Sequence, residues 1–165
     1  MTTYTFDFQD GNGPVPAHRH INGGGWVSDT AFVSEDAHVS NSACVYGDAH
    51  VSDSARVCGN ARVYGNARVY GSARVCGDAR VYNSAWVYGD AHVSDSAHVY
   101  GDARVCGDAH VYGNARVYGS ACVYGSARVY GDAHVYGNAR VSDNDFPMIS
   151  RSDGYTFIAV PCEDG

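Results

Sequence analysis

The chain has 165 residues, a formal net charge of −7 and no lysine, so all eleven of its basic residues are arginine. This length suits one domain, and no apolar run is long enough to span a membrane as a helix. The first eight residues lack the basic end and the apolar stretch of a secretory signal peptide. We therefore expect a cytoplasmic protein.

Residues 1–25 do not repeat, and we expect them to form an N-terminal cap on the segment that follows. Residues 3–8 alternate as in a short strand, and residues 11–16 have the composition of a loop. Three glycines at residues 23–25 lead into the next segment. Three apolar residues are expected to cover the first inward-facing valines: Phe6, Phe8 and Ile21.

Residues 26–142 follow a six-residue repeat, as in the stretch ARVYGS at residues 67–72. Valine recurs at every sixth position from Val27 to Val141, and alanine does so from Ala31 to Ala139. Because alternate side chains of an extended segment share a face, alanine and valine point inward while their neighbours point to solvent. Glycine, asparagine, aspartate and serine at the last two positions favour tight turns. Each repeat is therefore predicted to be one short strand and one corner.

This pattern resembles the hexapeptide repeat of left-handed parallel β-helices, in which an aliphatic residue and a small residue four positions later face inward. Residues 23–31, followed by such hexads, are similar more narrowly to the YdcK-type β-solenoid repeat of bacterial and phage-encoded proteins. The resemblance implies an all-β fold, a single-stranded left-handed parallel β-helix. It further implies three hexads in each eighteen-residue coil and about six or seven coils, at roughly 4.8 Å per coil.

An eighteen-residue coil places the outward residues in straight columns on three faces, and one face carries six tyrosines beside arginine and histidine. Stacked aromatic rings stabilise a parallel ladder, and arginine beside tyrosine adds cation–π contact, so a purely structural role is one interpretation. Tyrosine and arginine are also enriched in interface hot spots, which favours docking of a partner protein or homo-oligomerisation. The column is Tyr46, Tyr64, Tyr82, Tyr100, Tyr118 and Tyr136, and its flanking arginines are Arg62, Arg80 and Arg116.

Charge is nearly balanced along the repeats, where nine arginines accompany eleven carboxylates between Asp29 and Asp132. The acidic excess lies at the two ends of the chain. An acidic rod that mimics duplex nucleic acid needs negative charge along its length, and nucleic-acid binding needs a basic surface. Nucleic acid is therefore disfavoured both as a partner and as the object of mimicry.

The six cysteines show no CxxC motif and no zinc-ligand spacing. Cys58 and Cys76 are eighteen residues apart, so a three-sided coil stacks them with their Cα atoms about 5 Å apart, within reach of a disulfide. Reduced thiols are the favoured expectation, since disulfides are rare in the cytosol.

Residues 143–165 leave the repeat and are expected to cap the last coil. Residues 146–150 and 155–160 flank Ser152-Asp153-Gly154, which is a hairpin pattern.

The left-handed β-helix resemblance also implies two classes of trimeric enzyme. Acyltransferases of this fold use a histidine base and loops that leave the coils, whereas no hexad is interrupted here. Carbonic anhydrases of the γ class hold zinc on histidines across a trimer interface. The metal-ligand candidates in this chain are weak, since histidine alternates with arginine at the same repeat position: they are His92 and His110, one coil apart, and the His18/His20 pair.

The sequence therefore favours a non-enzymatic scaffold or binding module with no cofactor and no metal. By resemblance it is a phage or prophage accessory protein that engages a host protein. The trimeric enzyme is the alternative from another class. An ice-binding surface is disfavoured, because the outward columns hold tyrosine, arginine and histidine instead of rows of threonine.

Overall fold

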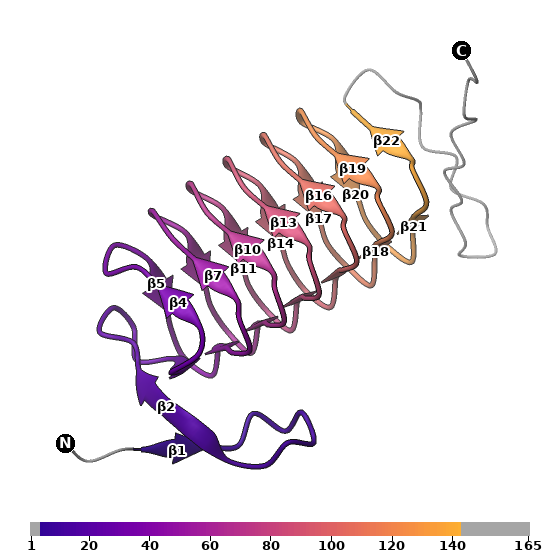
Figure 1. Ribbon diagram of the computed structural model, residues 1–165. Helices are drawn as coiled ribbons and strands as arrows, with labels where there is room; N and C mark the ends of the chain where they lie inside the picture. The colour runs from indigo at the N-terminus through magenta and orange to yellow at the C-terminus, as the bar shows by residue number, and fades with distance from the viewer. Residues whose placement is uncertain (1–3, 143–165) are drawn as a thin grey trace.

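The computed structural model describes residues 4–142, and these contain 22 strands and no helix. The strands stack along one axis in about six turns, as Figure 1 shows. The predicted all-β parallel solenoid is confirmed, while its left-handed winding stays a prediction. Over the same residues, no helix has the length and apolar character needed to cross a membrane.

Three sheets form the sides of the solenoid, and we call them the first, second and third face. The first runs β1 (Thr5–Phe6), β2 (Val15–Arg19), β3 (Trp26–Ser28), β6 (Cys44–Val45), β9 (Arg62–Val63), β12 (Arg80–Val81), β15 (His98–Val99), β18 (Arg116–Val117) and β21 (His134–Val135). The second runs β4 (Phe32–Val33), β7 (His50–Val51), β10 (Arg68–Val69), β13 (Trp86–Val87), β16 (Arg104–Val105), β19 (Cys122–Val123) and β22 (Arg140–Val141). The third runs β5 (His38–Val39), β8 (Arg56–Val57), β11 (Arg74–Val75), β14 (His92–Val93), β17 (His110–Val111) and β20 (Arg128–Val129).

Each solenoid strand pairs in parallel with the strand three places along the chain. Arg68 lies opposite Trp86 and Val69 opposite Val87, which is a register of eighteen residues. All the other parallel strand pairs have the same register. Backbone bonds continue this pairing from coil to coil, as in Trp86 N–H to the carbonyl of Ala103 at 2.9 Å. The predicted eighteen-residue coil is therefore confirmed.

Alanine and valine fill the interior, as their inward position in the repeat predicts. Val27 and every repeat alanine and valine from Ala37 to Val123 have no exposed surface. Only the two ends of the row depart from this, where Ala31 and Val33 are partly buried and Ala139 is 8% exposed. Small side chains permit a narrow tube, because each hexad contributes only one alanine and one valine to it.

The corners depend on a left-handed backbone position. Gly89 has φ +74°, and a Cβ there would lie 3.0 Å from the backbone nitrogen of Gly107 in the next coil. Asparagine or aspartate takes the position at four corners, with φ of 57–60°. At two of them the aspartate side chain also accepts a hydrogen bond from the equivalent corner of the next coil. Asp53 accepts from Gly71 N–H and Asp95 from Gly113 N–H, both at 3.0 Å.

The N-terminal residues form a hairpin that protects sheet edges. β1 and β2 pair antiparallel, and β2 pairs antiparallel with β3, the first solenoid strand of the first face. The following loop pairs with β5, the edge strand of the third face. Val39 accepts a hydrogen bond from Gly25 N–H at 2.8 Å and donates one to the carbonyl of Asn22 at 3.1 Å. Two edges that would otherwise be open at this end are thereby paired.

The residues expected to cover the first valines are used differently, so that prediction is wrong. Phe6 stacks on Trp26 with ring centroids 4.4 Å apart, and Phe8 stacks on Tyr46 at 4.8 Å. Ile21 is 84% exposed. The reason is the antiparallel pairing of β2 with β3, which places the hairpin beside outward-facing aromatic rings. The predicted hairpin cap of residues 146–160 lies outside the described residues.

Candidate docking face

The six predicted tyrosines form one continuous stack along the first face. Consecutive ring centroids lie 4.9, 4.9, 4.9, 5.0 and 5.4 Å apart, and neighbouring rings are tilted by 2–15°. Each ring follows a strand whose register places it over the ring of the previous coil. We call this column the tyrosine ladder: Tyr46, Tyr64, Tyr82, Tyr100, Tyr118 and Tyr136.

Exposure changes along the ladder. Tyr46 is only 6% exposed, the next four rings are half-buried, and Tyr136 is 45% exposed. The residue at the ladder position of the first coil is Ser28, which is small and buried, and the ring of Phe8 stacks on the adjacent face of Tyr46. Phe8 thus extends the ladder by one ring that comes from outside the repeat.

The N-terminal segment also forms a hydrogen bond with one of the arginines predicted for the docking face. Arg62 Nη1 donates a hydrogen bond to the carbonyl of Phe8 at 3.3 Å. Tyr46 and Arg62 are therefore already engaged within the chain, and the open part of the predicted docking face begins beyond them. The sequence alone could not show this, because residues 1–25 share no period with the ladder.

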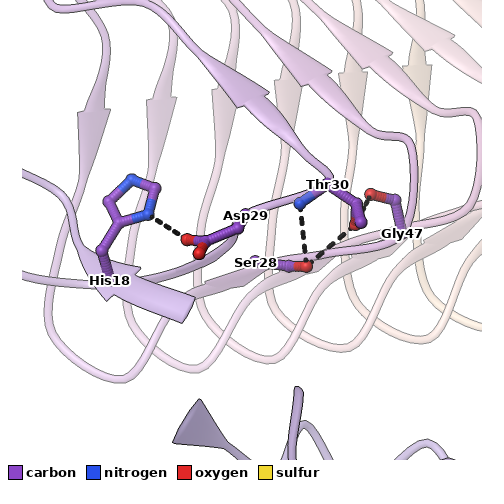
Figure 2. A network of polar contacts seen from close by, with 5 residues as sticks. All are labelled: His18, Ser28, Asp29, Thr30 and Gly47. Carbon is purple, nitrogen blue, oxygen red and sulfur yellow. Dashed lines mark hydrogen bonds and ion pairs between the residues drawn. The ribbon is translucent and has the colours of Figure 1, made fainter. Parts of the chain in front are cut away.

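A polar network, shown in Figure 2, joins the N-terminal hairpin of β1 and β2 to the first corner of the solenoid. His18 Nδ1 lies 2.9 Å from a carboxylate oxygen of Asp29, and the Thr30 hydroxyl donates to the carbonyl of Gly47 at 2.7 Å. Ser28 and Thr30 share a further hydroxyl contact at 2.9 Å. A groove of about 340 Å³ lies beside it, lined among others by Phe8, Asp10, Asp29, Thr30 and Tyr46.

A column of arginine and histidine side chains runs beside the ladder. The register stacks Arg62, Arg80, His98, Arg116 and His134 in that order. His98 packs edge-on against Tyr82 with ring centroids 6.2 Å apart, and His134 does the same against Tyr118 at 6.2 Å. Burial, together with the positive charges of Arg80 and Arg116, lowers the pKa of His98.

The arginines of the solenoid have no carboxylate partner in the part of the chain that the structure describes. Within residues 4–142 the ion pair found is His18–Asp29, and none of the nine repeat arginines takes part in one. The carboxylates lie at corners instead, where Asn60 donates to Asp78 at 2.9 Å and Asn114 to Asp132 at 3.0 Å. Positive charge therefore occupies the flat faces and negative charge the corners.

Cation–π contact was expected beside the ladder, and in the described part of the chain it occurs elsewhere. On the second face, Arg68 and Arg104 precede and follow Trp86 in the register, and their guanidinium carbons lie 5.1 and 5.5 Å from the centroid of its ring. Arg140 lies 5.5 Å from the ring of Tyr124, and Arg19 lies 4.1 Å from that of Trp26. Ladder faces are already occupied by other tyrosines, which leaves only their edges to the arginines.

Burial in the stack favours the neutral form of three central phenols of the ladder. Burial raises the pKa of Tyr64, Tyr82 and Tyr100, and for Tyr82 the neighbouring phenols of Tyr64 and Tyr100 raise it further. A neutral phenol can both donate and accept a hydrogen bond. On the second face, a hydrogen bond to Cys106 raises the pKa of Tyr88 to about 12.

The weak metal candidates form two separate pairs, one on the third face and one in the N-terminal segment. His92 and His110 stack with ring centroids 4.8 Å apart, and burial together with the charge of His110 lowers the pKa of His92. His18 contacts Asp29, while the ring of His20 lies 3.2 Å from the carbonyl of Ser34. In residues 4–142 no group of three or more histidine, cysteine or acidic side chains could hold a metal ion.

Cys58 and Cys76 differ from the expectation of reduced thiols. They form a disulfide between adjacent coils of the third face, with Cα atoms 4.6 Å apart. The coil spacing predicts this proximity; the redox state does not follow from it. Cys44, Cys106 and Cys122 are free.

Comparison with known proteins supports the repeat type. Four segments match the model of the YdcK β-solenoid repeat: residues 55–71, 61–75, 73–89 and 109–125. No curated protein and no solved structure matches the chain significantly. The chain therefore carries YdcK-type β-solenoid repeats, and these matches assign it no catalytic residue.

Proposed function

We propose that this chain is a rigid, non-enzymatic β-solenoid scaffold that docks a partner protein, or a second copy of itself, through the first face. The observation that carries the proposal is the stack of half-buried phenols from Tyr82 to Tyr118 beside arginines that have no carboxylate partner among the described residues. Backbone bonds join the coils and stacking holds the rings of Tyr82, Tyr100 and Tyr118, so these side chains lose little further freedom on binding. Tyrosine and arginine are also the side chains enriched where binding energy concentrates.

The partner we propose is a host protein. The support is the resemblance of the repeat to runs in bacterial and phage-encoded proteins, which agrees with a phage or prophage accessory role in the cytoplasm.

The test compares two sets of three substitutions. Tyr82→Ser, Tyr100→Ser and Tyr118→Ser interrupt the ladder, while Tyr70→Ser, Tyr88→Ser and Tyr124→Ser remove three tyrosines from the same repeat position on the second face. Association is followed by sedimentation velocity over a range of concentrations and by capture of partners from an extract of the source cells, with circular dichroism as the check of folding.

We expect only the ladder set to abolish self-association or capture of a specific protein. If both folded variants associate as the natural chain does, the ladder is a stabilising element alone and the proposal is wrong. A zinc-containing trimer in metal analysis and sedimentation would also contradict it, since that result belongs to the enzyme alternative.

A further inference from the structure

The N-terminal segment shows how an extended stretch of chain can contact the ladder. Residues 4–12 read YTFDFQDGN and combine aromatic rings with carboxylates. The ring of Phe8 stacks on Tyr46 at 4.8 Å, while its carbonyl accepts the hydrogen bond from Arg62. The first face therefore already binds one extended segment in two ways. A ladder tyrosine stacks on an aromatic ring of the segment, and an arginine beside the ladder donates a hydrogen bond to the backbone of the segment.

Tyrosine rings and arginines recur further along the face, where no other segment of residues 4–142 stacks on them. Tyr82, Tyr100 and Tyr118 are half-buried, and Arg80 and Arg116 are exposed. In the described chain neither arginine has a carboxylate partner, and His98 lies between them in the column. We call these residues the open strip. Two exposed guanidinium groups without a counter-charge among the described residues attract an anionic group.

We propose that the open strip binds an extended acidic peptide segment of a partner protein that carries aromatic side chains. This inference rests on the proposed function and adds the chemistry of the partner. Carboxylates would form charge-assisted hydrogen bonds with the two guanidinium groups, and aromatic side chains would contact the edges of the phenol rings and their hydroxyls.

A protein segment fits the strip better than a nucleic acid does. The corners on either side of the first face carry exposed carboxylates, among them Asp78 and Asp132 on one side and Asp102 on the other. A continuous phosphate backbone would lie close to these negative charges, whereas a peptide can place its acidic residues over the arginines alone. The net charge of −7 also disfavours the binding of a nucleic acid.

The probes are three labelled nonapeptides whose binding to the full chain is measured by fluorescence anisotropy. One repeats Glu-Phe-Asp, one repeats Glu-Ala-Asp and one repeats Lys-Phe-Lys. We expect only the acidic aromatic peptide to bind, and we expect added salt to weaken its binding because exposed charges carry part of it. Equal binding of the peptide that lacks phenylalanine would overturn the aromatic part of the inference.

Two matched pairs of substitutions locate the site. Arg80→Gln with Arg116→Gln removes the charges of the open strip, and Arg74→Gln with Arg128→Gln removes two exposed arginines from the same repeat position on the third face. We expect the first pair to weaken peptide binding at least about tenfold, since each lost bond involves two charged groups. The second pair should leave it nearly unchanged, and equal losses in the two pairs would overturn the site.

A titration of the histidines by NMR gives a readout at the strip itself. A bound carboxylate beside His98 should raise the pKa of that residue, while the signal of His110 on the third face should not move. A single-stranded DNA 12-mer that binds more tightly than the acidic peptide and shifts His98 instead would assign the strip to nucleic acid and overturn the inference. If a protein is captured through the ladder but no peptide binds, the proposed function stands and this inference fails.

Discussion

One backbone position in each corner limits how closely successive coils can stack. At Gly89 a side chain meets two obstacles, the left-handed φ of +74° and the backbone of Gly107 at 3.0 Å. We expect Gly89→Ala to lower the free energy of unfolding by about 1–2 kcal/mol, from the unfavourable backbone region alone. The midpoint of thermal unfolding, followed by circular dichroism, measures the loss.

Two control variants separate the causes at this corner. Gly131 has φ +63° but nothing within 4 Å of its Cβ position, so Gly131→Ala should be the milder change. Gly89→Asn should also be milder than Gly89→Ala, because Asn83 already occupies an equivalent corner at φ 58°. A Gly89→Ala variant as stable as the natural chain would contradict the steric account of the corners.

The disulfide between Cys58 and Cys76 gives a second prediction for single residues. It closes a segment of eighteen residues, which limits the unfolded chain. Replacing both cysteines by serine should lower the free energy of unfolding by about 3 kcal/mol, and a reductant should do the same to the natural chain. Cys122→Ser is the control and should leave the effect of the reductant intact. Labelling of both Cys58 and Cys76 by a thiol reagent without prior reduction would show that the pair is not bonded.

At the scale of an element, the ladder makes stability depend on alkaline pH. Burial raises the pKa of Tyr64, Tyr82 and Tyr100 above the ordinary 10.0. Below pH 10.0 both states keep their protons and the stability is complete. As pH rises further, the unfolded chain ionises first, so the stability falls until the folded phenols also lose their protons.

We therefore expect the melting temperature to drop above about pH 10. Changing Tyr64, Tyr82 and Tyr100 to phenylalanine keeps the stacked rings and removes the titrating hydroxyls. The melting temperature of that variant should depend less on pH in this range, and ultraviolet titration of the natural chain should show phenols that ionise late. The same drop in the variant would assign it to other groups.

The parts of the fold that repeat could be predicted, and the parts that do not repeat could not. The period places Tyr82 above Tyr64 because parallel pairing fixes every outward column once the coil length is known. Nothing in the period indicates that Phe8 extends the ladder, since its contact with Tyr46 depends on how an antiparallel hairpin docks. The open strip is accordingly shorter than the column that the sequence predicts.

The distribution of charge belongs to the whole molecule. A count of the charged residues makes the solenoid almost neutral. The structure nevertheless separates the positive from the negative charges, with arginines on the faces and carboxylates such as Asp78 and Asp132 at the corners. A balanced sum can therefore hide a cationic strip bordered by anionic edges. Such a pattern favours partners with local acidic groups over uniformly charged polymers.

The molecule is also quasi-one-dimensional, since each coil contacts only its neighbours along the axis (Figure 1). Two deletions use this property. Removing residues 91–108 takes out one coil of eighteen residues and brings Tyr118 over Tyr82, so all columns continue. Removing residues 91–96 keeps the inward alanines and valines in phase but moves every later residue to the preceding face, so Cys106 follows Tyr82 in the ladder column and interrupts the ladder.

If alanine and valine burial alone decided stability, the shorter deletion would give the more stable protein, because it keeps more coils. The number of stacked tyrosine pairs does not change this order, because either deletion leaves seven pairs in register, each adding about 0.2–1 kcal/mol. We therefore expect the deletion of residues 91–96 to melt at the higher temperature. Thermal unfolding by circular dichroism compares the two proteins directly. A higher melting temperature for the deletion of residues 91–108 would instead show that one unbroken ladder on the first face stabilises the fold more than the additional buried alanines and valines do.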